Sequence, residues 1–126
     1  MPLGFIFPFD FGMIPGTLAE DGDPLDVLLL MEDALYPGTF VDVRIIGALK
    51  AEQTKNKRVR NDRLIAVVPT CPVFGHLESI NTVSEQLKRH IEQFFATYNL
   101  VQMKEFKALG WADEQEAMKL LQESLR

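Results

Sequence analysis

Three aspartates crowd into six residues directly in front of a wholly apolar segment. Residues 21–26 read DGDPLD, and residues 27–31 read VLLLM. A continuous apolar run of this length is typical of a strand that is buried on both faces. Carboxylates this close together repel one another unless cations lie between them. The fold must therefore bury a strand that begins at a concentrated negative charge.

The strand pattern of the chain favours a small β-barrel. Apolar and β-branched residues separated by turn residues predict further strands at 40–49, 64–68 and 105–109, with a basic hairpin tip at 55–60. Short strands linked by turns, without a crossover helix between them, are typical of small barrels rather than of parallel sheets.

Two amphipathic helices are expected in the second half of the chain. Apolar residues recur at steps of three and four over 84–98 and again over 112–125, which gives each segment one apolar stripe. Asn81, Thr82 and Ser84 are candidate N-caps of the first helix. The predicted fold class is therefore mainly β with two helices.

Composition narrows the class of protein. The 126 residues fit a single domain over 1–126, and 47% hydrophobic with 25% charged residues is an ordinary globular balance. The formal charge of −5 disfavours nucleic-acid binding. Cys71 is the single cysteine, which excludes a disulfide within the chain and a multi-cysteine metal site. No run of about 20 apolar residues is present, so we expect no membrane span and a cytoplasmic protein.

The aspartate cluster has two interpretations when the residues are considered alone. Hard carboxylate oxygens without histidine or cysteine favour Mg²⁺, Mn²⁺ or Ca²⁺ over zinc or copper. An acidic surface turn with solvated carboxylates is the alternative. Because the cluster adjoins a core strand, packing fixes its position, and the two interpretations stand about even.

The motif and its surroundings resemble the soluble inorganic pyrophosphatases of family I. Residues 21–27 (DGDPLDV) match the signature Asp-x-Asp-Pro-apolar-Asp-apolar of that family. Residues 7–12 (FPFDFG) resemble its upstream aromatic segment, and residues 36–38 (YPG) resemble its downstream turn. The likeness continues through residues 63–67 and the first predicted helix, so it covers nearly the whole chain.

This resemblance implies an OB-like closed β-barrel of about five strands with two helices. It implies a Mg²⁺-dependent hydrolase, with Mn²⁺ as a possible substitute, that converts pyrophosphate to two orthophosphates. Asp21 and Asp26 would be metal ligands, and Asp23 would hold or deprotonate the attacking water. Members of the family from bacteria form trimers or hexamers, so we expect a homo-oligomer.

Other site residues follow from the same resemblance. The family has an Asp two residues before a Lys that opens a strand; here Arg63 takes the Lys position. Asn61 stands two residues before Arg63 and Asp62 one residue before it, and we predict Asp62 as the ligand. Glu52 is a second, weaker candidate for a metal ligand, and Tyr98 and Arg63 are predicted to bind the substrate.

Departures from the family pattern leave alternatives open. Phe7 and Phe11 stand where many members have Tyr. The barrel is expected to be truncated at its amino terminus, without early strands that carry a Glu, a Lys, another Glu and an Arg of the family site. A non-catalytic descendant that binds metal or phosphate and oligomerises is therefore the second hypothesis. A nucleic-acid-binding OB barrel is a third, which the net charge disfavours.

Overall fold

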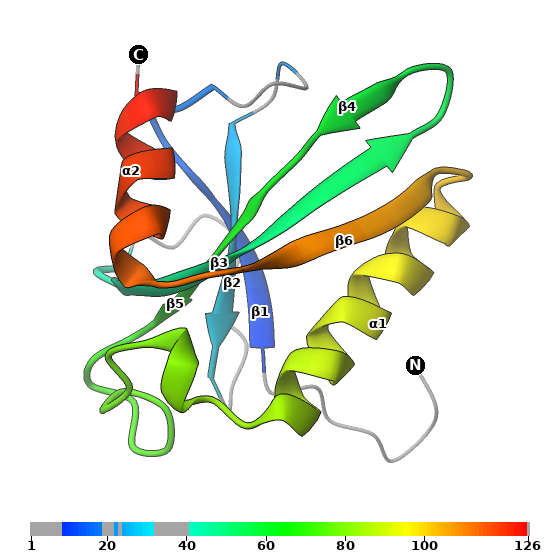
Figure 1. Cartoon of the computed structure of the whole chain (residues 1–126). Helices are drawn as coiled ribbons and strands as arrows, with labels where there is room; N and C mark the ends of the chain where they lie inside the picture. The colour runs from blue at the N-terminus through cyan, green and yellow to red at the C-terminus, as the bar shows by residue number, and fades with distance from the viewer. Residues whose placement is uncertain (1–8, 19–21, 23, 32–40, 126) are drawn as a thin grey trace.

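The structure is a computed structural model of the chain, and it describes residues 9–18, 22, 24–31 and 41–125. Six strands, two α-helices and one 3₁₀ helix make up this part of the chain (Figure 1). In chain order they are β1 Phe9–Ile14, β2 Leu25–Leu30, β3 Arg44–Thr54, β4 Arg58–Arg60, β5 Arg63–Val67, η1 Ile80–Thr82, α1 Glu85–Val101, β6 Glu105–Ala112 and α2 Glu114–Ser124.

All six strands belong to one sheet, in which β3 is the central and longest element. The strand order is β1-β2-β5-β3-β4, and β6 pairs with β3. The β2–β5 pair is parallel, whereas the other pairs are antiparallel. β4 and β5 follow one another along the same edge of β3, because Glu52 pairs with Arg60 and Leu49 pairs with Arg63.

The sheet separates two apolar clusters, each covered by one helix. Figure 1 shows α2 and α1 on different sides of the strands. Ala117 of α2 joins one cluster, together with Leu25, Val27 and Leu64. The second cluster, on the α1 side, contains Leu28, Leu30, Ile46, Leu49, Ile65, Val67, Ile80, Val83, Ile91 and Phe95. Because strand side chains alternate between faces, consecutive residues of β2 and β5 enter different clusters, which explains the continuous apolar runs.

Both helices begin at side-chain caps. Ser84 caps α1, and its hydroxyl accepts a hydrogen bond from the Leu87 N–H at 3.1 Å. Asp113 caps α2, and its carboxylate accepts from the Glu116 N–H at 2.9 Å. Such caps satisfy donors that the helix itself leaves unpaired. Ser84 is one of the predicted caps; for the second helix the sequence predicts a start near Ala112, and its cap is found at Asp113.

The predicted fold class is confirmed, with three differences in detail. β3 begins at Arg44 rather than at residue 40, and the basic hairpin contains a short strand, β4, after its tip. In the part of the chain that the structure describes, β1 pairs only with β2 and β6 only with β3, so the predicted closure into a barrel is not observed. The predicted turn at 36–38 lies outside the described residues.

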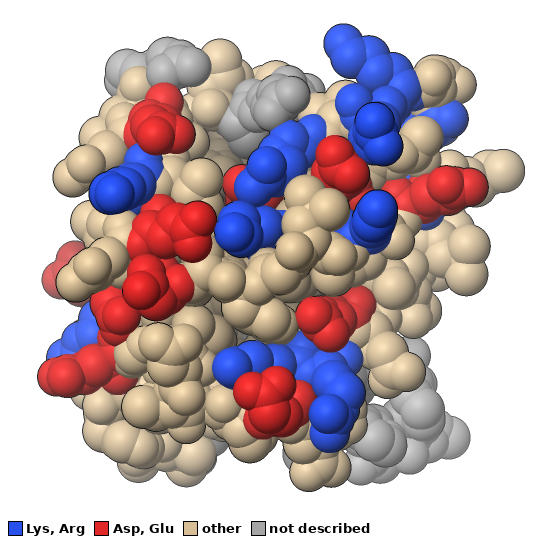
Figure 2. Space-filling view, viewed as in Figure 1, with Lys and Arg blue, Asp and Glu red and all other residues tan. Residues whose placement is uncertain are grey.

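Charge is distributed unevenly over the surface. Figure 2 shows acidic side chains along α2 and basic side chains over the β3–β4 hairpin. Lys55, Lys57 and Arg58 are exposed there, as the predicted hairpin tip requires. No helix in the described ranges is long and apolar enough to cross a membrane.

Candidate active site

A pocket of about 270 Å³ lies where β1, β2 and β5 approach the carboxyl-terminal half of α1. Its lining residues come from four separate elements. They are Gly12, Met13, Asp26, Arg63, Phe95 and Tyr98. Three residues that the sequence predicted for the site, Asp26, Arg63 and Tyr98, therefore meet in one pocket.

The parallel pairing of β2 and β5 places Asp26 beside Arg63. Val27 and Leu64 are register partners, so the residues that precede them stand next to each other at the starts of the two strands. On its other side, Asp26 pairs with Met13 of β1. An acidic and a basic side chain are thus presented from neighbouring strands on the α1 face of the sheet.

Arg63 is almost fully buried, with 3% of its surface exposed. One guanidinium nitrogen, Nη1, donates to the Asn61 carbonyl oxygen at 2.7 Å. The guanidinium carbon lies 4.5 Å from the centre of the Phe95 ring, within the range of a cation–π contact. A planar cation with several donors is well suited to bind phosphate oxygens.

Tyr98 lies one helical turn after Phe94 on α1, close to the end of the helix. Its ring stacks on that of Phe94, with centroids 6.2 Å apart and planes at 17°. The residue is 46% exposed, in contrast to Phe95, which is 1% exposed and anchors the helix in the core. Tyr98 therefore brings a phenolic group to the pocket from a position that packing holds in place.

Asp62 and Glu52, the other two predicted ligands, are engaged outside this pocket. Asp62 lies between β4 and β5, both of which pair with β3. Its carboxylate accepts from the Ala51 N–H of β3 at 3.1 Å, where neither strand provides a partner. The same oxygen, Oδ1, accepts from Arg60 Nε at 2.7 Å. Glu52 contacts Arg58 at 3.8 Å. Both carboxylates thus have local partners in the β3–β4 hairpin.

Asp21 and Asp23 lie outside the described residues, so Asp26 alone represents the aspartate cluster in the structure. Within the described ranges, no group of three acidic, histidine or cysteine side chains could hold a metal ion. The donor set nevertheless fits a hard divalent cation, because the three aspartates of residues 21–26 supply only carboxylate oxygens.

Two residues near Arg63 carried no signal in the sequence. Gln53 of β3 places its amide oxygen 3.5 Å from Arg63 Nη2. The Phe106 ring of β6 lies 5.4 Å from the guanidinium carbon. Strand alternation predicts which residues of one strand share a face with Gln53 or with Phe106. Only the strand pairing shows that both residues lie on the same face of the sheet as Arg63.

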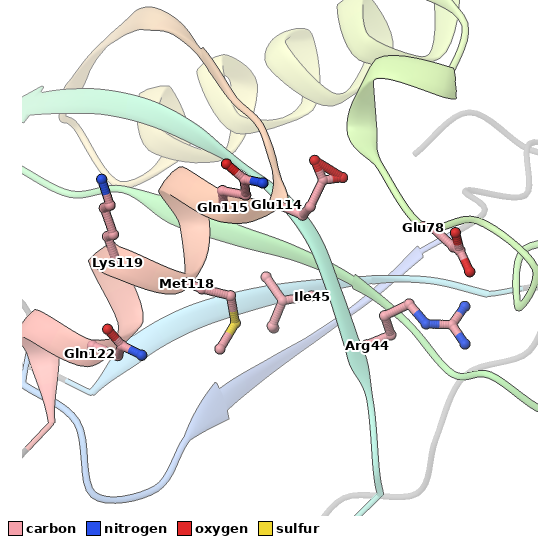
Figure 3. A pocket seen from close by; sticks show the side chains of 8 residues that line it. All are labelled: Arg44, Ile45, Glu78, Glu114, Gln115, Met118, Lys119 and Gln122. Atoms are coloured by element: carbon pink, nitrogen blue, oxygen red, sulfur yellow. The ribbon is translucent and has the colours of Figure 1, made fainter.

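A larger hollow of about 550 Å³ lies elsewhere, between the start of β3 and α2 (Figure 3). Arg44 at its rim donates to the carbonyl oxygens of Gly75 and Leu77 at 2.9 and 3.1 Å. Glu78 and Lys119 also line it. It contains none of the predicted site residues, so size alone does not identify the candidate site.

Comparison with known proteins decides the family. A family model described as inorganic pyrophosphatase matches residues 1–126. The chain belongs to the inorganic pyrophosphatase family. This confirms the predicted family, and with it the prediction of a hydrolase that acts on diphosphate, from a family that depends on metal ions.

Relatives and solved structures of inorganic pyrophosphatases agree closely with the chain. The protein from Leifsonia xyli is 37% identical over 119 residues, covering 94% of this chain and 71% of the relative. The crystal structure from Thermus thermophilus has a TM-score of 0.79 at 39% identity, covering 94% of this chain and 68% of that one. The Helicobacter pylori enzyme has a TM-score of 0.83 at 30% identity, covering 94% and 69%.

Proposed function

We propose that this inorganic pyrophosphatase chain hydrolyses diphosphate to two orthophosphates at the pocket lined by Asp26, Arg63 and Tyr98. One observation carries the proposal: Asp26 of β2, Arg63 of β5 and Tyr98 of α1, which the family resemblance predicted for the site from distant parts of the sequence, line the same pocket. An acidic residue, a buried guanidinium and a phenol side by side suit a substrate that is an anion accompanied by cations.

The metal is proposed to be Mg²⁺, with Mn²⁺ as a substitute. Asp21 and Asp26 would hold it, since hard oxygen ligands favour these ions. A bound ion of this kind lowers the pKa of a coordinated water and offsets charge on the phosphates. The position of Asp26 supports this role: it is the second residue of β2, between buried Leu25 and buried Val27, so the core fixes its backbone.

Other side chains are proposed to transfer the proton and to bind the phosphates. Asp23 would accept a proton from the attacking water, a role that requires a carboxylate placed next to the metal ligands. Arg63 would donate to phosphate oxygens and offset their charge, and Tyr98 would donate its hydroxyl hydrogen to a phosphate oxygen. Asp62 and Glu52 stay predictions as ligands, and their hydrogen bond and ion pair in the β3–β4 hairpin give each a local structural role.

The test is phosphate release from magnesium diphosphate, measured for the wild type and for Asp23→Asn. Because a positioned general base contributes about 10²–10⁴-fold, kcat should fall by at least 100-fold in the variant. Asp42→Asn, at an exposed position before β3, is the matched control and should keep its activity. A wild type that binds Mg²⁺ but releases no phosphate would instead support the non-catalytic descendant.

A homo-oligomer is also proposed. The outer edges of β1 and β6 have no strand partner among the described residues, and such edges favour pairing with another chain. Sedimentation velocity of the purified chain measures this directly, and a monomer at micromolar concentration would contradict it.

A further inference from the structure

The Arg63 guanidinium is contacted by side chains from three elements, α1, β6 and β3. Its guanidinium lies against Phe95 of α1 at 4.5 Å and against Phe106 of β6 at 5.4 Å, measured to the ring centroids. The two rings stack on one another with centroids 6.2 Å apart. Gln53 of β3 adds an amide oxygen at 3.5 Å from Nη2. Contacts of this kind restrict the rotamers of a long side chain.

Gln53 and Phe106 contact the guanidinium from adjacent positions on two paired strands. They are direct register partners in the antiparallel β3–β6 pair, so their side chains project from the same face of the sheet. Leu49, four residues before Gln53 on β3, pairs with Arg63 itself. The β3–β6 ladder therefore sets where the guanidinium lies relative to Asp26, although neither Gln53 nor Phe106 lines the pocket.

We propose that Gln53 and Phe106 are positioning residues, which hold the Arg63 guanidinium against Phe95 so that it meets a phosphoryl group of the substrate beside Asp26. This deepens the proposed function and rests on it. A neutral amide suits the role, because its oxygen accepts from Nη2 without neutralising the charge. A carboxylate at position 53 would pair with Arg63 and compete with the phosphate for its donors.

The experiment combines Gln53→Met and Phe106→Leu with Arg63→Lys in double-mutant cycles. Steady-state kinetics give KM and kcat, and calorimetry gives the affinity for methylenediphosphonate, a diphosphate analogue without a scissile P–O–P bridge, in the presence of Mg²⁺. Gln53→Met and Phe106→Leu should each raise KM and the analogue Kd by roughly three- to tenfold. The effect is modest because the Gln53 contact is long, at 3.5 Å, and because the Phe106 ring restricts the Arg63 side chain without contacting the substrate. The value of kcat should change less than twofold.

The cycle separates positioning from packing. A lysine has no planar fork for Gln53 to orient, so adding Gln53→Met to Arg63→Lys should have no further effect on KM. The same rise in KM in both backgrounds would show that Gln53 acts through general packing, and would overturn the inference. Melting temperatures, measured in parallel, show whether Phe106→Leu remains folded, and Gln53→Met keeps the test valid if it does not.

Two further variants complete the test. Thr54→Val, at the next position of β3 and on its other face, is the matched control and should leave KM within twofold. Gln53→Glu should raise KM and the analogue Kd, whereas tighter analogue binding or faster turnover in this variant would overturn the inference. A wild type without phosphate release would contradict the proposed function itself. Normal turnover with unchanged KM in Gln53→Met and Phe106→Leu would contradict the positioning role alone.

Discussion

Replacing Arg63 by methionine removes the one buried cation of the pocket while keeping a long apolar stem. The guanidinium is proposed to make at least one charge-assisted contact with the substrate, and such a contact is worth about 1.5–3 kcal/mol. Since about 1.4 kcal/mol corresponds to a factor of ten, kcat/KM for magnesium diphosphate should fall by roughly 10- to 150-fold. Phosphate release under first-order conditions measures this ratio directly.

The same change should lower the free energy of unfolding but leave the protein folded. Arg63→Met leaves the Asn61 carbonyl oxygen without its donor at 2.7 Å, a loss of about 1–3 kcal/mol for a buried group. The cation–π contact with Phe95, 4.5 Å away, adds up to about 2 kcal/mol. Contacts of the methionine sulfur with the rings return about 0.3–1.5 kcal/mol, and a buried charge no longer has to be desolvated. A net loss of about 1–3 kcal/mol leaves a typical domain folded.

Arg58→Met is the matched control for this prediction. Arg58 lies on the preceding strand, β4, but its side chain is 70% exposed and its contact with Glu52 is long, at 3.8 Å. Surface pairs of this kind contribute about 0–1 kcal/mol, so activity and stability should both stay near wild type. If folded Arg63→Met retains kcat/KM within twofold of the wild type, Arg63 does not contact the substrate and the proposed geometry of the pocket is refuted.

Two predictions concern the scaffold. A Cβ added at Gly47 would lie 2.6 Å from the Ile80 Cβ and 2.8 Å from the Ala112 carbonyl oxygen, so Gly47→Ala should destabilise by about 1–3 kcal/mol or more; an unchanged denaturation midpoint would contradict this close packing. Asp113→Ala removes the carboxylate that accepts from Glu116 N–H, and should cost about 1 kcal/mol in chemical denaturation, whereas Asp113→Ser should restore most of it.

The helices and the buried strands were the most predictable parts of the fold. The apolar stripe that predicted a helix over 84–98 contains Ile91 and Phe95, which are 0% and 1% exposed in the structure. Helices can be predicted in this way because the residues of the buried face recur at a regular spacing within one short segment of the sequence. The start of β3 was less predictable, since residues 41–43 have strand-like composition but no ladder partner in the described residues.

Within the candidate site, motifs in the sequence predicted several of the residues, but only the pairing of the strands shows which of them lie together. Asp26 belongs to a recognisable aspartate cluster, and Tyr98 matches a position of the family pattern near the end of the predicted helix, so the sequence pointed to both. Gln53 did not, because one amide in an alternating strand is ordinary. Its position next to Arg63 depends on the β3–β4 hairpin, whose strands flank the turn at 55–57, and on the register of β3 with β5. Register is a property of the folded sheet, and a shift of one residue would exchange the two faces.

The same reasoning explains why Asp62 is not at the pocket although it stands next to Arg63 in the chain. Successive residues of an extended segment project in different directions, so the neighbour of a pocket residue is directed elsewhere. Asp62 is directed into the sheet, where it completes the ladder at Ala51 between two short strands. Asn61, two residues before Arg63, donates from its backbone to the Ala51 carbonyl oxygen at 2.9 Å and accepts from Arg63. The β4–β5 junction therefore joins the sheet to the guanidinium through Asn61, and the carboxylate of Asp62 stabilises that junction.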